Sequence, residues 1–259
     1  MNRIKNYDRL AFDIDRWLKD YYYMYAIKAF VVGVSGGIDS AVVSTLCAKT
    51  GLPTYILTMP LNSSVKNTEL SDAHALALKE KYDNVTHYNI DLSDPYHKLI
   101  STIGLKTAPE GLTVNRELIT NNLANANTKS RMRMVTLYQI AGSVGGIVVG
   151  TGNKVEDYGV GFYTKYGDGG VDIAPIADLY KTEVRELGGY LGVDYSIIDA
   201  KPTDGLWEDG RSDEDQIGAT YSELEEAMEK GTGKAVDILY NFNKQNRHCL
   251  LYTSDAADE

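Results

Sequence analysis

Residues 30–43 of the 259-residue chain read FVVGVSGGIDSAVV, an apolar run that ends in glycines, serines and an aspartate before apolar residues return. The first run predicts a buried β-strand, and the wider apolar spacing after it predicts a helix. In a parallel α/β sheet, a turn from strand to helix lies at the carboxyl edge, where ligands bind. Backbone N–H groups and the positive end of the helix favour phosphate there, and Gly33, Gly36 and Gly37 let a phosphate approach the backbone. The stretch therefore predicts a phosphate-binding loop, and a tight turn that merely tolerates glycine is the alternative.

The polar side chains of the same turn indicate a metal ion. Ser35 and Ser40 can donate hydrogen bonds to phosphate, whereas the carboxylate of Asp39 repels phosphate unless a cation lies between them. Because Mg²⁺ prefers a carboxylate together with phosphate oxygens, we expect Asp39 to bind Mg²⁺. The turn lacks the lysine of GxxxxGK[ST] and the spacing of GxGxxG, so it matches neither of these phosphate motifs.

Segments typical of strands and of helices alternate along the chain. The alternation favours an α/β fold with a doubly wound, mostly parallel sheet of about five strands flanked by helices. Residues 151–172 are rich in glycine and charge, so we expect them outside the core. No repeat or linker divides the chain, which predicts one domain over residues 1–248. Strands are expected at 29–34, 51–59, 86–92 and 146–150, and helices at 4–24, 38–49, 71–82, 116–143, 178–192, 221–231 and 233–247.

The composition limits the class of function. A hydrophobic content of 43% is enough for a sizeable core, and a formal net charge of −10 argues against a nucleic-acid partner, which needs a basic face. Cys47 and Cys249 share no ligand spacing, so reduced thiols in a cytoplasmic protein are expected. The sequence has neither a signal peptide nor a stretch typical of a membrane span, so no membrane partner is expected.

Residues 249–259, CLLYTSDAADE, show no helical period and no turn chemistry. They resemble the conceptual translation of a sequencing adapter, which predicts a non-native tail after residue 248. A frayed natural terminus is the alternative.

Four segments resemble known enzymes. Residues 35–40, SGGIDS, resemble the SGGxDS motif of the PP-loop ATP pyrophosphatases, which cleave ATP between the α- and β-phosphates. Three further segments resemble the ammonia-dependent NAD⁺ synthetases of that superfamily, in the order expected and over residues 33 to about 205. These segments are NTKSRMRMVTLY at 127–138, GTGNKVE at 150–156 and FYTKYGDGGVDIAPIADLYK at 162–181.

The resemblance implies that nicotinic acid adenine dinucleotide (deamido-NAD⁺), ATP and ammonia react to give NAD⁺, AMP and pyrophosphate. The carboxylate would first be adenylated, because ammonia cannot displace oxide directly. With no residues left for a glutaminase domain, free ammonia, or ammonia from a separate protein, is the expected donor. Another PP-loop adenylating enzyme, or a sensor of the same fold that binds ATP without turnover, are the alternatives.

Site residues carry over from the resemblance by position. The loop would bind the phosphates, and Asp39 with Glu156 would bind Mg²⁺; a solvated loop acid is the alternative for Glu156. Lys181, the last residue of the fourth segment, would bind ATP and take part in catalysis. The residues expected at ATP are Gly33, Ser35, Gly36, Gly37, Asp39, Ser40, Thr151, Lys181 and Thr203.

Three residues are expected at deamido-NAD⁺ by the same resemblance, namely Arg131, Lys165 and Asp172. On spacing alone, Arg131 equally suits a charged solvent face that includes Lys129 and Arg133. We also expect Asp168 to help remove a proton from ammonium, with ordinary turn chemistry as the alternative.

Three further expectations concern the ends of the domain and its assembly. The acidic loop at 203–218 is a candidate lid, with a plain surface loop as the alternative. The family usually ends near a His-Lys pair, but His248 is followed here by Cys249, which puts the closing residues in doubt. The resemblance also implies a homodimer, with the aromatic first helix and the helix at 116–143 as interface candidates.

Overall fold

The computed structural model describes residues 4–62, 65–105, 117–203 and 211–250. Its centre is a parallel sheet of four strands in the order β3-β2-β1-β4. Phe30 of β1 pairs with Thr54 of β2 on one side and Ile147 of β4 on the other. The strand order therefore reverses its direction at β1. The strands are β1 (Phe30–Val34), β2 (Thr54–Thr58), β3 (Val85–Asn89) and β4 (Ile147–Val148).

The predicted α/β fold with a doubly wound parallel sheet is confirmed. A fifth position exists beyond β4 only as an isolated parallel bridge between Val149 and Ile173, where the N–H of Gly150 donates to the carbonyl of Ile173 at 2.7 Å. Among the described residues, the sheet thus has four strands where about five were expected.

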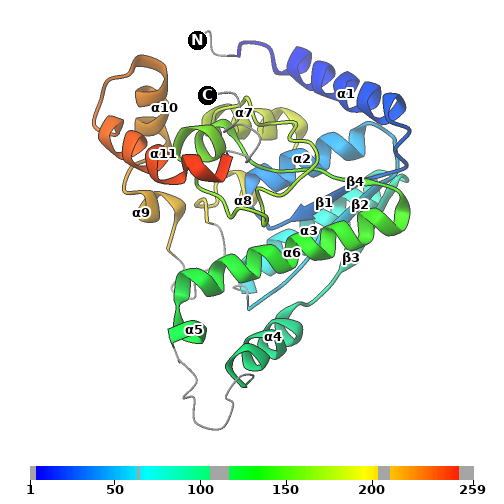
Figure 1. Cartoon of the computed structure of the whole chain (residues 1–259). Coiled ribbons are helices and arrows are strands. Elements are labelled where there is room, and N and C mark those ends of the chain that lie inside the picture. The colour runs from blue at the N-terminus through cyan, green and yellow to red at the C-terminus, as the bar shows by residue number, and fades with distance from the viewer. Residues whose placement is uncertain (1–3, 63–64, 106–116, 204–210, 251–259) are drawn as a thin grey trace.

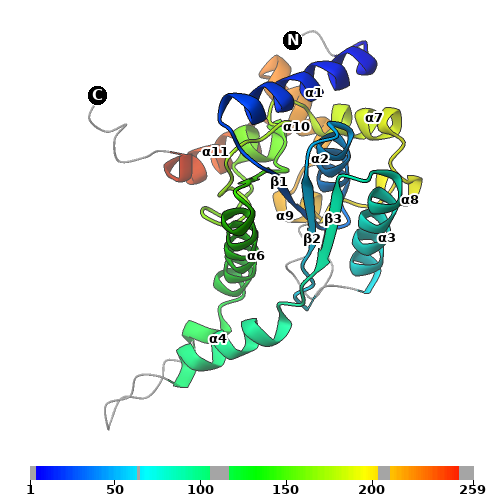
Figure 2. The ribbon, with the colours of Figure 1, turned by 90° about the vertical axis from the view of Figure 1, so that its right-hand side faces the viewer.

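Helices cover both faces of the sheet (Figures 1 and 2). One long helix, α6 (Asn122–Val144), covers much of one face, and α4 (Ser93–Leu105) packs into the same core cluster with α5 (Glu117–Thr120) beside it. The connections from β1 to β2 and from β2 to β3 place their helices on the opposite face, as right-handed crossovers require. That face carries α1 (Tyr7–Met24), α2 (Ile38–Lys49), α3 (Val65–Lys81), α7 (Lys181–Leu191) and α8 (Tyr195–Ile198).

The core surrounds β1 and α2. Phe30, Val31 and Val32 are fully buried because helices cover both faces of their strand. Helix α2 is apolar around most of its circumference, which is typical of a helix enclosed on all sides. It packs between the sheet, α1 and α7, and this packing fixes the start of α2 at the end of β1.

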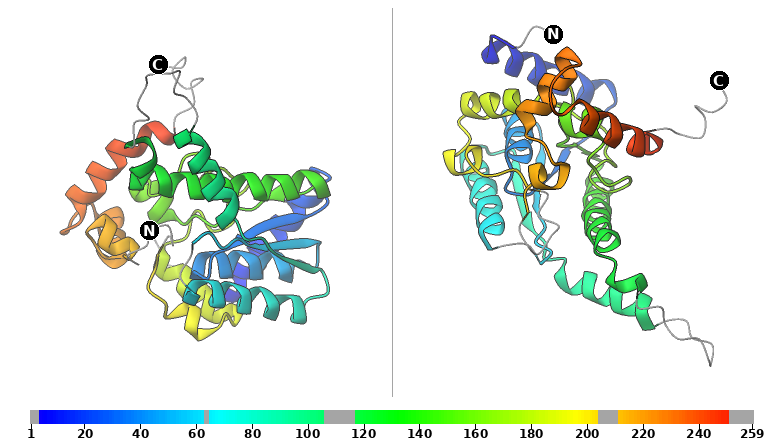
Figure 3. Two further views of the ribbon diagram at one scale, coloured as in Figure 1. Left: turned by 90° about the horizontal axis from the view of Figure 1, so that it is seen from below. Right: turned by 90° about the vertical axis from the view of Figure 1, so that its left-hand side faces the viewer.

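A second, smaller core lies at one end of the molecule, where α9 (Asp213–Ile217), α10 (Tyr221–Lys230) and α11 (Val236–Leu250) gather beside the sheet (Figure 3). These helices pack on a π-helix, η1 (Val155–Val160). Val155 and Val160 are fully buried there, so the expectation that residues 151–172 lie outside the core was wrong. The valines are too widely spaced among polar residues to form a recognisable apolar run.

Several helices differ from the sequence expectation: α3 begins at Val65 rather than at residue 71, and α8 and α9 were not predicted. Helix α4 was not predicted, although its Pro95 lies in the first turn, where a missing N–H costs little. Helix α6 begins at Asn122 rather than 116, because the side chain of Asn121 caps it by accepting from the N–H of Ala124 at 2.9 Å. Among the described residues, no helix is both long and apolar enough to cross a membrane.

Candidate active site

The predicted phosphate loop joins β1 to α2, and hydrogen bonds within it fix its shape. The Oγ of Ser40 accepts from the N–H of Ser35 at 3.1 Å and donates to the carbonyl of Gly37 at 3.0 Å. The N–H of Gly37 donates to the Oγ of Ser35 at 3.3 Å. Gly36 adopts φ +89°, a left-handed conformation that favours glycine. The loop is therefore preformed rather than dependent on a ligand for its shape.

A cavity of about 620 Å³ opens in front of this loop, within the range of small-molecule sites. It lies at the carboxyl ends of β1 and β4, where an open α/β sheet changes its winding direction. Thirteen of the predicted site residues line it: Gly33, Ser35, Gly36, Gly37, Asp39, Ser40, Arg131, Thr151, Glu156, Lys165, Asp168, Lys181 and Thr203.

Asp172 is not among the cavity-lining residues. Its Oδ1 accepts from the hydroxyl of Tyr138 at 3.0 Å, and its Oδ2 accepts from the N–H of Val148 at 2.7 Å. These contacts tie α6 to β4, which is a structural task. A contact between Asp172 and the dinucleotide stays a prediction.

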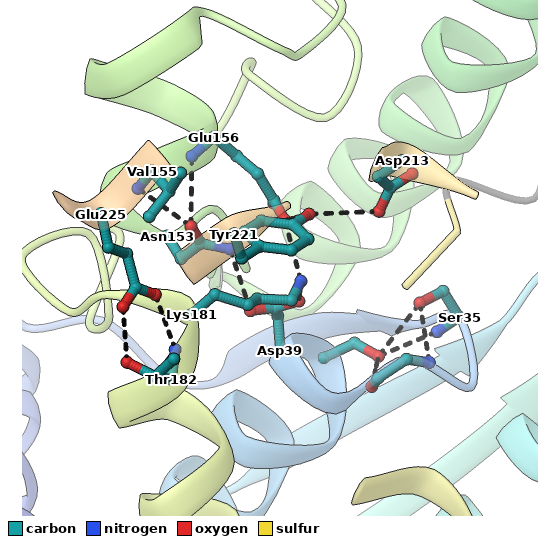
Figure 4. A network of polar contacts seen from close by, with 12 residues as sticks. Ser35, Asp39, Asn153, Val155, Glu156, Lys181, Thr182, Asp213, Tyr221 and Glu225 are labelled. Carbon is teal, nitrogen blue, oxygen red and sulfur yellow. Dashed lines mark hydrogen bonds and ion pairs between the residues drawn. The ribbon is translucent and has the colours of Figure 1, made fainter. Parts of the chain in front are cut away.

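The two carboxylates predicted at Mg²⁺ converge on one ammonium group (Figure 4). The Nζ of Lys181, from the start of α7, donates to the Oδ2 of Asp39 and, at 2.8 Å, to the Oε1 of Glu156. The Lys181 side chain is 3% exposed and the Glu156 side chain 16%. Glu156 therefore lies inside the cavity and not on a solvated outer loop.

Burial and charge act in opposite directions on these three groups. Burial lowers the pKa of Lys181, but Asp39 and Glu156 together raise it above its usual value, so the amine is charged. Burial raises the pKa of Glu156, yet Lys181 and its hydrogen bonds outweigh this and lower it overall. Burial also raises the pKa of Asp39, where the nearby Glu156 carboxylate partly offsets the effect of Lys181.

Asn153 links the phosphate loop to the segment that carries Glu156. Its Nδ2 donates to the Oδ1 of Asp39 at 3.1 Å. Its Oδ1 accepts from the N–H groups of Val155 at 3.0 Å and Glu156 at 3.1 Å, which caps η1. One fully buried amide thus sets the position of one carboxylate relative to the other.

Asp157 follows Glu156 in η1 and lines the cavity as well. Its carboxylate lies against Gly152, where any Cβ would approach Asp157 to 2.1 Å. Burial, followed by the neighbouring carboxylates of Glu156, Asp168 and Asp39, raises the pKa of Asp157 to about 8. The neighbouring carboxylates and burial therefore disfavour a further negative charge at Asp157 near neutral pH.

Asp168 faces the cavity from the YGDGG turn. Its Oδ1 accepts from the Oγ of Ser130 at 2.7 Å and from the N–H of Thr164 at 3.0 Å. The N–H of Asp168 donates back to the Oγ of Ser130 at 2.9 Å. The turn and α6 are thereby joined, and the carboxylate has a fixed orientation.

The cations of α6 do not form a solvent face. Lys129 is 6% exposed, with its Nζ 5.6 Å from the ring centroid of Tyr96. The Nε of Arg133 donates to the carbonyl of Met59 at 3.2 Å. Arg131 is exposed to the cavity, and its Nε donates to the carbonyl of Lys165 at 3.1 Å.

Sequence and structure comparisons agree with this geometry. A family model described as NAD synthase matches residues 10–254. The chain is 38% identical over 245 residues to the NH(3)-dependent NAD(+) synthetase of Finegoldia magna, covering 94% of this chain and 93% of the relative. It is 36% identical over 247 residues to that of Carboxydothermus hydrogenoformans, with 94% and 95% covered. The chain belongs to the NAD synthase family.

Two solved structures of this kind are similar to the chain. The NMN synthetase from Francisella tularensis matches with a TM-score of 0.85 at 31% identity, covering 96% of this chain and 98% of that one. The NH3-dependent NAD synthetase from Campylobacter jejuni matches with a TM-score of 0.71 at 24% identity, with the same coverage, and supports the fold alone.

NAD synthases use ATP, and the residues present here fit a divalent cation that accompanies it. A single ammonium reaches one oxygen of Asp39 and one of Glu156, so both carboxylates point at one place in the cavity. Within the described part of the chain, no group of three or more His, Cys, Asp or Glu residues forms a metal site by itself. Phosphate oxygens and water would therefore complete the coordination shell, as is usual for Mg²⁺.

Sequence reasoning missed several residues of this NAD synthase site. Asn153 and Asp157 lie in or directly after the GTGNKVE segment, but an amide cap and a π-turn have no sequence pattern of their own. Tyr221 comes from a segment that was predicted only as a closing helix, and Asp213 from the acidic loop predicted at 203–218. Residues 204–210 of the candidate lid at 203–218 lie outside the described residues, and residues 213–217 of it form α9. The predicted tail falls largely on residues 251–259, which also lie outside the described residues.

Proposed function

We propose that this chain joins ammonia to the carboxyl group of deamido-NAD⁺ at the expense of ATP, with release of NAD⁺, AMP and pyrophosphate. The observation that carries the proposal is one cavity that combines a phosphate loop, two convergent carboxylates and cationic side chains for a second anion. The relatives named as NH(3)-dependent NAD(+) synthetases support the same reaction.

The first step has to bring two anions together. An oxygen of the substrate carboxylate attacks the α-phosphorus of ATP, the bond to the bridging oxygen breaks, and pyrophosphate leaves with the electron pair. Lys181 is charged and lies beside the loop, where it can offset negative charge on the phosphates. Arg131 and Lys165 lie on the α6 side of the cavity, where they can hold the dinucleotide.

The second step forms the amide. The ammonia nitrogen attacks the carbonyl carbon of the adenylate, AMP leaves with the bond electrons, and the nitrogen loses a proton. We assign that proton, or the one lost earlier from ammonium, to Asp168, whose carboxylate faces the cavity and is oriented by Ser130 and Thr164. Ammonium itself has no lone pair and cannot attack.

The proposal also covers the metal ion, the cellular location and the oligomeric state. Asp39 and Glu156 would hold Mg²⁺, which when bound offsets phosphate charge and polarises the α-phosphate. The chain would act as a cytoplasmic homodimer. A sedimentation or light-scattering measurement of the full chain tests the dimer, and a monomer at micromolar concentration would contradict it.

One assay tests the reaction. The protein is incubated with deamido-NAD⁺, ATP, Mg²⁺ and ammonium, and NAD⁺, AMP and pyrophosphate are quantified. Equal amounts of the three products are expected. Pyrophosphate release without the dinucleotide would favour a different adenylating enzyme, and ATP binding without any product would favour a sensor.

A second candidate is amidation of the mononucleotide to give NMN. The observation that favours it is the similarity to the NMN synthetase from Francisella tularensis at a TM-score of 0.85 and 31% identity. The two substrates share the reacting carboxylate, so the same site chemistry serves both. Parallel assays with the mononucleotide and the dinucleotide decide between them by the ratio of kcat/KM.

A further inference from the structure

Tyr221, the first residue of α10, is 2% exposed and points into the cavity wall from outside the sheet (Figure 4). Its hydroxyl donates to the Oε1 of Glu156 at 2.6 Å. The Oδ2 of Asp213 lies 3.3 Å from the same hydroxyl. A phenol has one proton to donate, so the much shorter contact with Glu156 takes it.

The acceptor oxygen is the one that also contacts Lys181. The Nζ of Lys181 donates to the Oε1 of Glu156 at 2.8 Å, so this oxygen receives two hydrogen bonds. With its Oε1 held from two directions, the Glu156 carboxylate has one orientation toward Asp39. Hydrogen bonds to a charged acceptor are strong and directional.

The ring of Tyr221 also contacts the cation. The Nζ of Lys181 lies 4.9 Å from the ring centroid, a cation–π distance in a buried setting. One side chain therefore contacts both the glutamate and the lysine that face the phosphate loop.

Helix α10 is attached firmly enough to transmit this position. Glu225, which is fully buried, accepts from the N–H of Thr182 at 3.0 Å and from its Oγ1 at 2.7 Å. Thr182 follows Lys181 directly in the first turn of α7. The N–H of Tyr221 donates to the Oε1 of Glu214 at 2.9 Å, which ties α10 to α9.

We propose that Tyr221 is a positioning residue, which orients Glu156 through its hydroxyl and Lys181 through its ring, and so completes the nucleotide site from the carboxyl-terminal helices. The proposal rests on the proposed function for the identity of the nucleotide. It requires no contact between Tyr221 and the substrates.

The test measures the affinity of the full-length protein for α,β-methylene-ATP in saturating Mg²⁺ by isothermal titration calorimetry. Tyr221→Phe keeps the ring and removes the hydroxyl. A hydrogen bond to a charged group corresponds to about a tenfold change in an equilibrium constant, so the dissociation constant is expected to rise about 10-fold. In a protein that already carries Glu156→Gln, Tyr221→Phe is expected to change the dissociation constant by less than about 2-fold, because the hydroxyl no longer donates to a charged acceptor.

A matched control comes from α7. The hydroxyl of Tyr190 donates to the Oδ1 of Asp8 at the same 2.6 Å, but this pair joins α7 to α1 outside the cavity. Tyr190→Phe is therefore expected to leave the affinity for the analogue unchanged. Thermal unfolding of every variant separates loss of the fold from loss of the site.

An unchanged affinity in Tyr221→Phe would overturn the proposal, and so would an equal loss in the wild-type and Glu156→Gln backgrounds. Should Tyr221→Phe be recovered unfolded, p-fluorophenylalanine at position 221 fills the place of the hydroxyl without a donor; affinity equal to the wild type would then refute the proposal. These measurements need no dinucleotide. A failure to make NAD⁺ would therefore count against the proposed function and leave the role of Tyr221 readable.

Discussion

Replacing Gly36 by alanine tests whether the loop geometry, rather than its glycine content, makes the phosphate site. Gly36 adopts φ +89°, and a Cβ there would lie 2.7 Å from the backbone carbonyl oxygen of Asn67 and 3.3 Å from the Cβ of Leu70. The adjacent Gly37 has φ −90°, and its nearest added contact would be the Oγ of Ser35 at 3.4 Å. Gly37→Ala is thus a control one residue away.

The magnitude follows from two costs. A left-handed conformation costs an alanine about 1–2 kcal/mol relative to glycine. Overpacking against backbone that cannot retreat costs about 1–3 kcal/mol. Gly36→Ala is therefore expected to lower the free energy of unfolding by about 3 kcal/mol, whereas Gly37→Ala is expected to change it by less than about 1 kcal/mol, because alanine also restricts the unfolded chain.

Urea unfolding gives the stability of each variant, and calorimetry with an ATP analogue gives its affinity. If the clash is relieved by moving the loop away from α3, part of the stability loss disappears and ATP affinity falls instead, by about 10-fold or more for each 1.4 kcal/mol of distortion. Gly36→Ala with both the stability and the affinity of the wild type would refute the reasoning.

Three further predictions concern charges. Lys181→Met leaves Asp39 and Glu156 facing each other without a cation, so the free energy of unfolding is expected to fall by about 3–5 kcal/mol in urea titrations; unchanged stability would contradict the ion pairs. Arg131→Lys loses the planar fork and is expected to raise KM for the dinucleotide about 10-fold with KM for ATP unchanged, and a rise in both would place the arginine elsewhere. Burial lowers the pKa of His74 from 6.5 to about 4, so the unfolded chain takes up the proton first as the pH falls. Stability present above pH 6.5 is thus expected to decline by about 3 kcal/mol between pH 6.5 and pH 4, and His74→Gln should flatten this decline in pH-dependent unfolding.

The sequence alone was sufficient to predict the part of the site that lies at the carboxyl edge of the sheet. A buried strand followed by glycines can end only at the carboxyl edge of a parallel sheet, so the place of Ser35–Ser40 follows from local pattern and topology. The residues of the FYTKYGDGG segment were assigned to the site by resemblance to the family, and not by local pattern and topology. Asp172 was assigned by the same route, and its carboxylate accepts hydrogen bonds from Tyr138 and Val148, so its contact with the dinucleotide stays a prediction.

The rest of the site could not be predicted because it depends on contacts between distant segments. Tyr221 meets Glu156 across 65 positions of sequence, and its helix has the same amphipathic pattern whether or not it touches a cavity. The π-turn that brings in Asp157 is a one-residue change in hydrogen bonding, which residue periodicity does not resolve. In the sequence, Asn153 looks like any other asparagine in a loop. Only the structure shows that its side chain caps η1.

Charge explains why ATP should need a divalent cation in this cavity. Burial, and then the carboxylates of Glu156, Asp168 and Asp39, raise the pKa of Asp157 to about 8, so near neutral pH this group stays mostly protonated because further negative charge is disfavoured here. Against them Lys181 supplies one buried positive charge, already shared between two carboxylates. A triphosphate brings several further negative charges to the same place, and a low-dielectric wall strengthens their repulsion. On the proposed function, a free triphosphate would be disfavoured here, whereas a metal-bound one would be attracted because Asp39 and Glu156 would serve as metal ligands. We therefore expect the cavity to bind the metal complex of ATP more tightly than ATP itself, and titrations of the analogue with and without Mg²⁺ should differ most in the wild type and least when both carboxylates are amides.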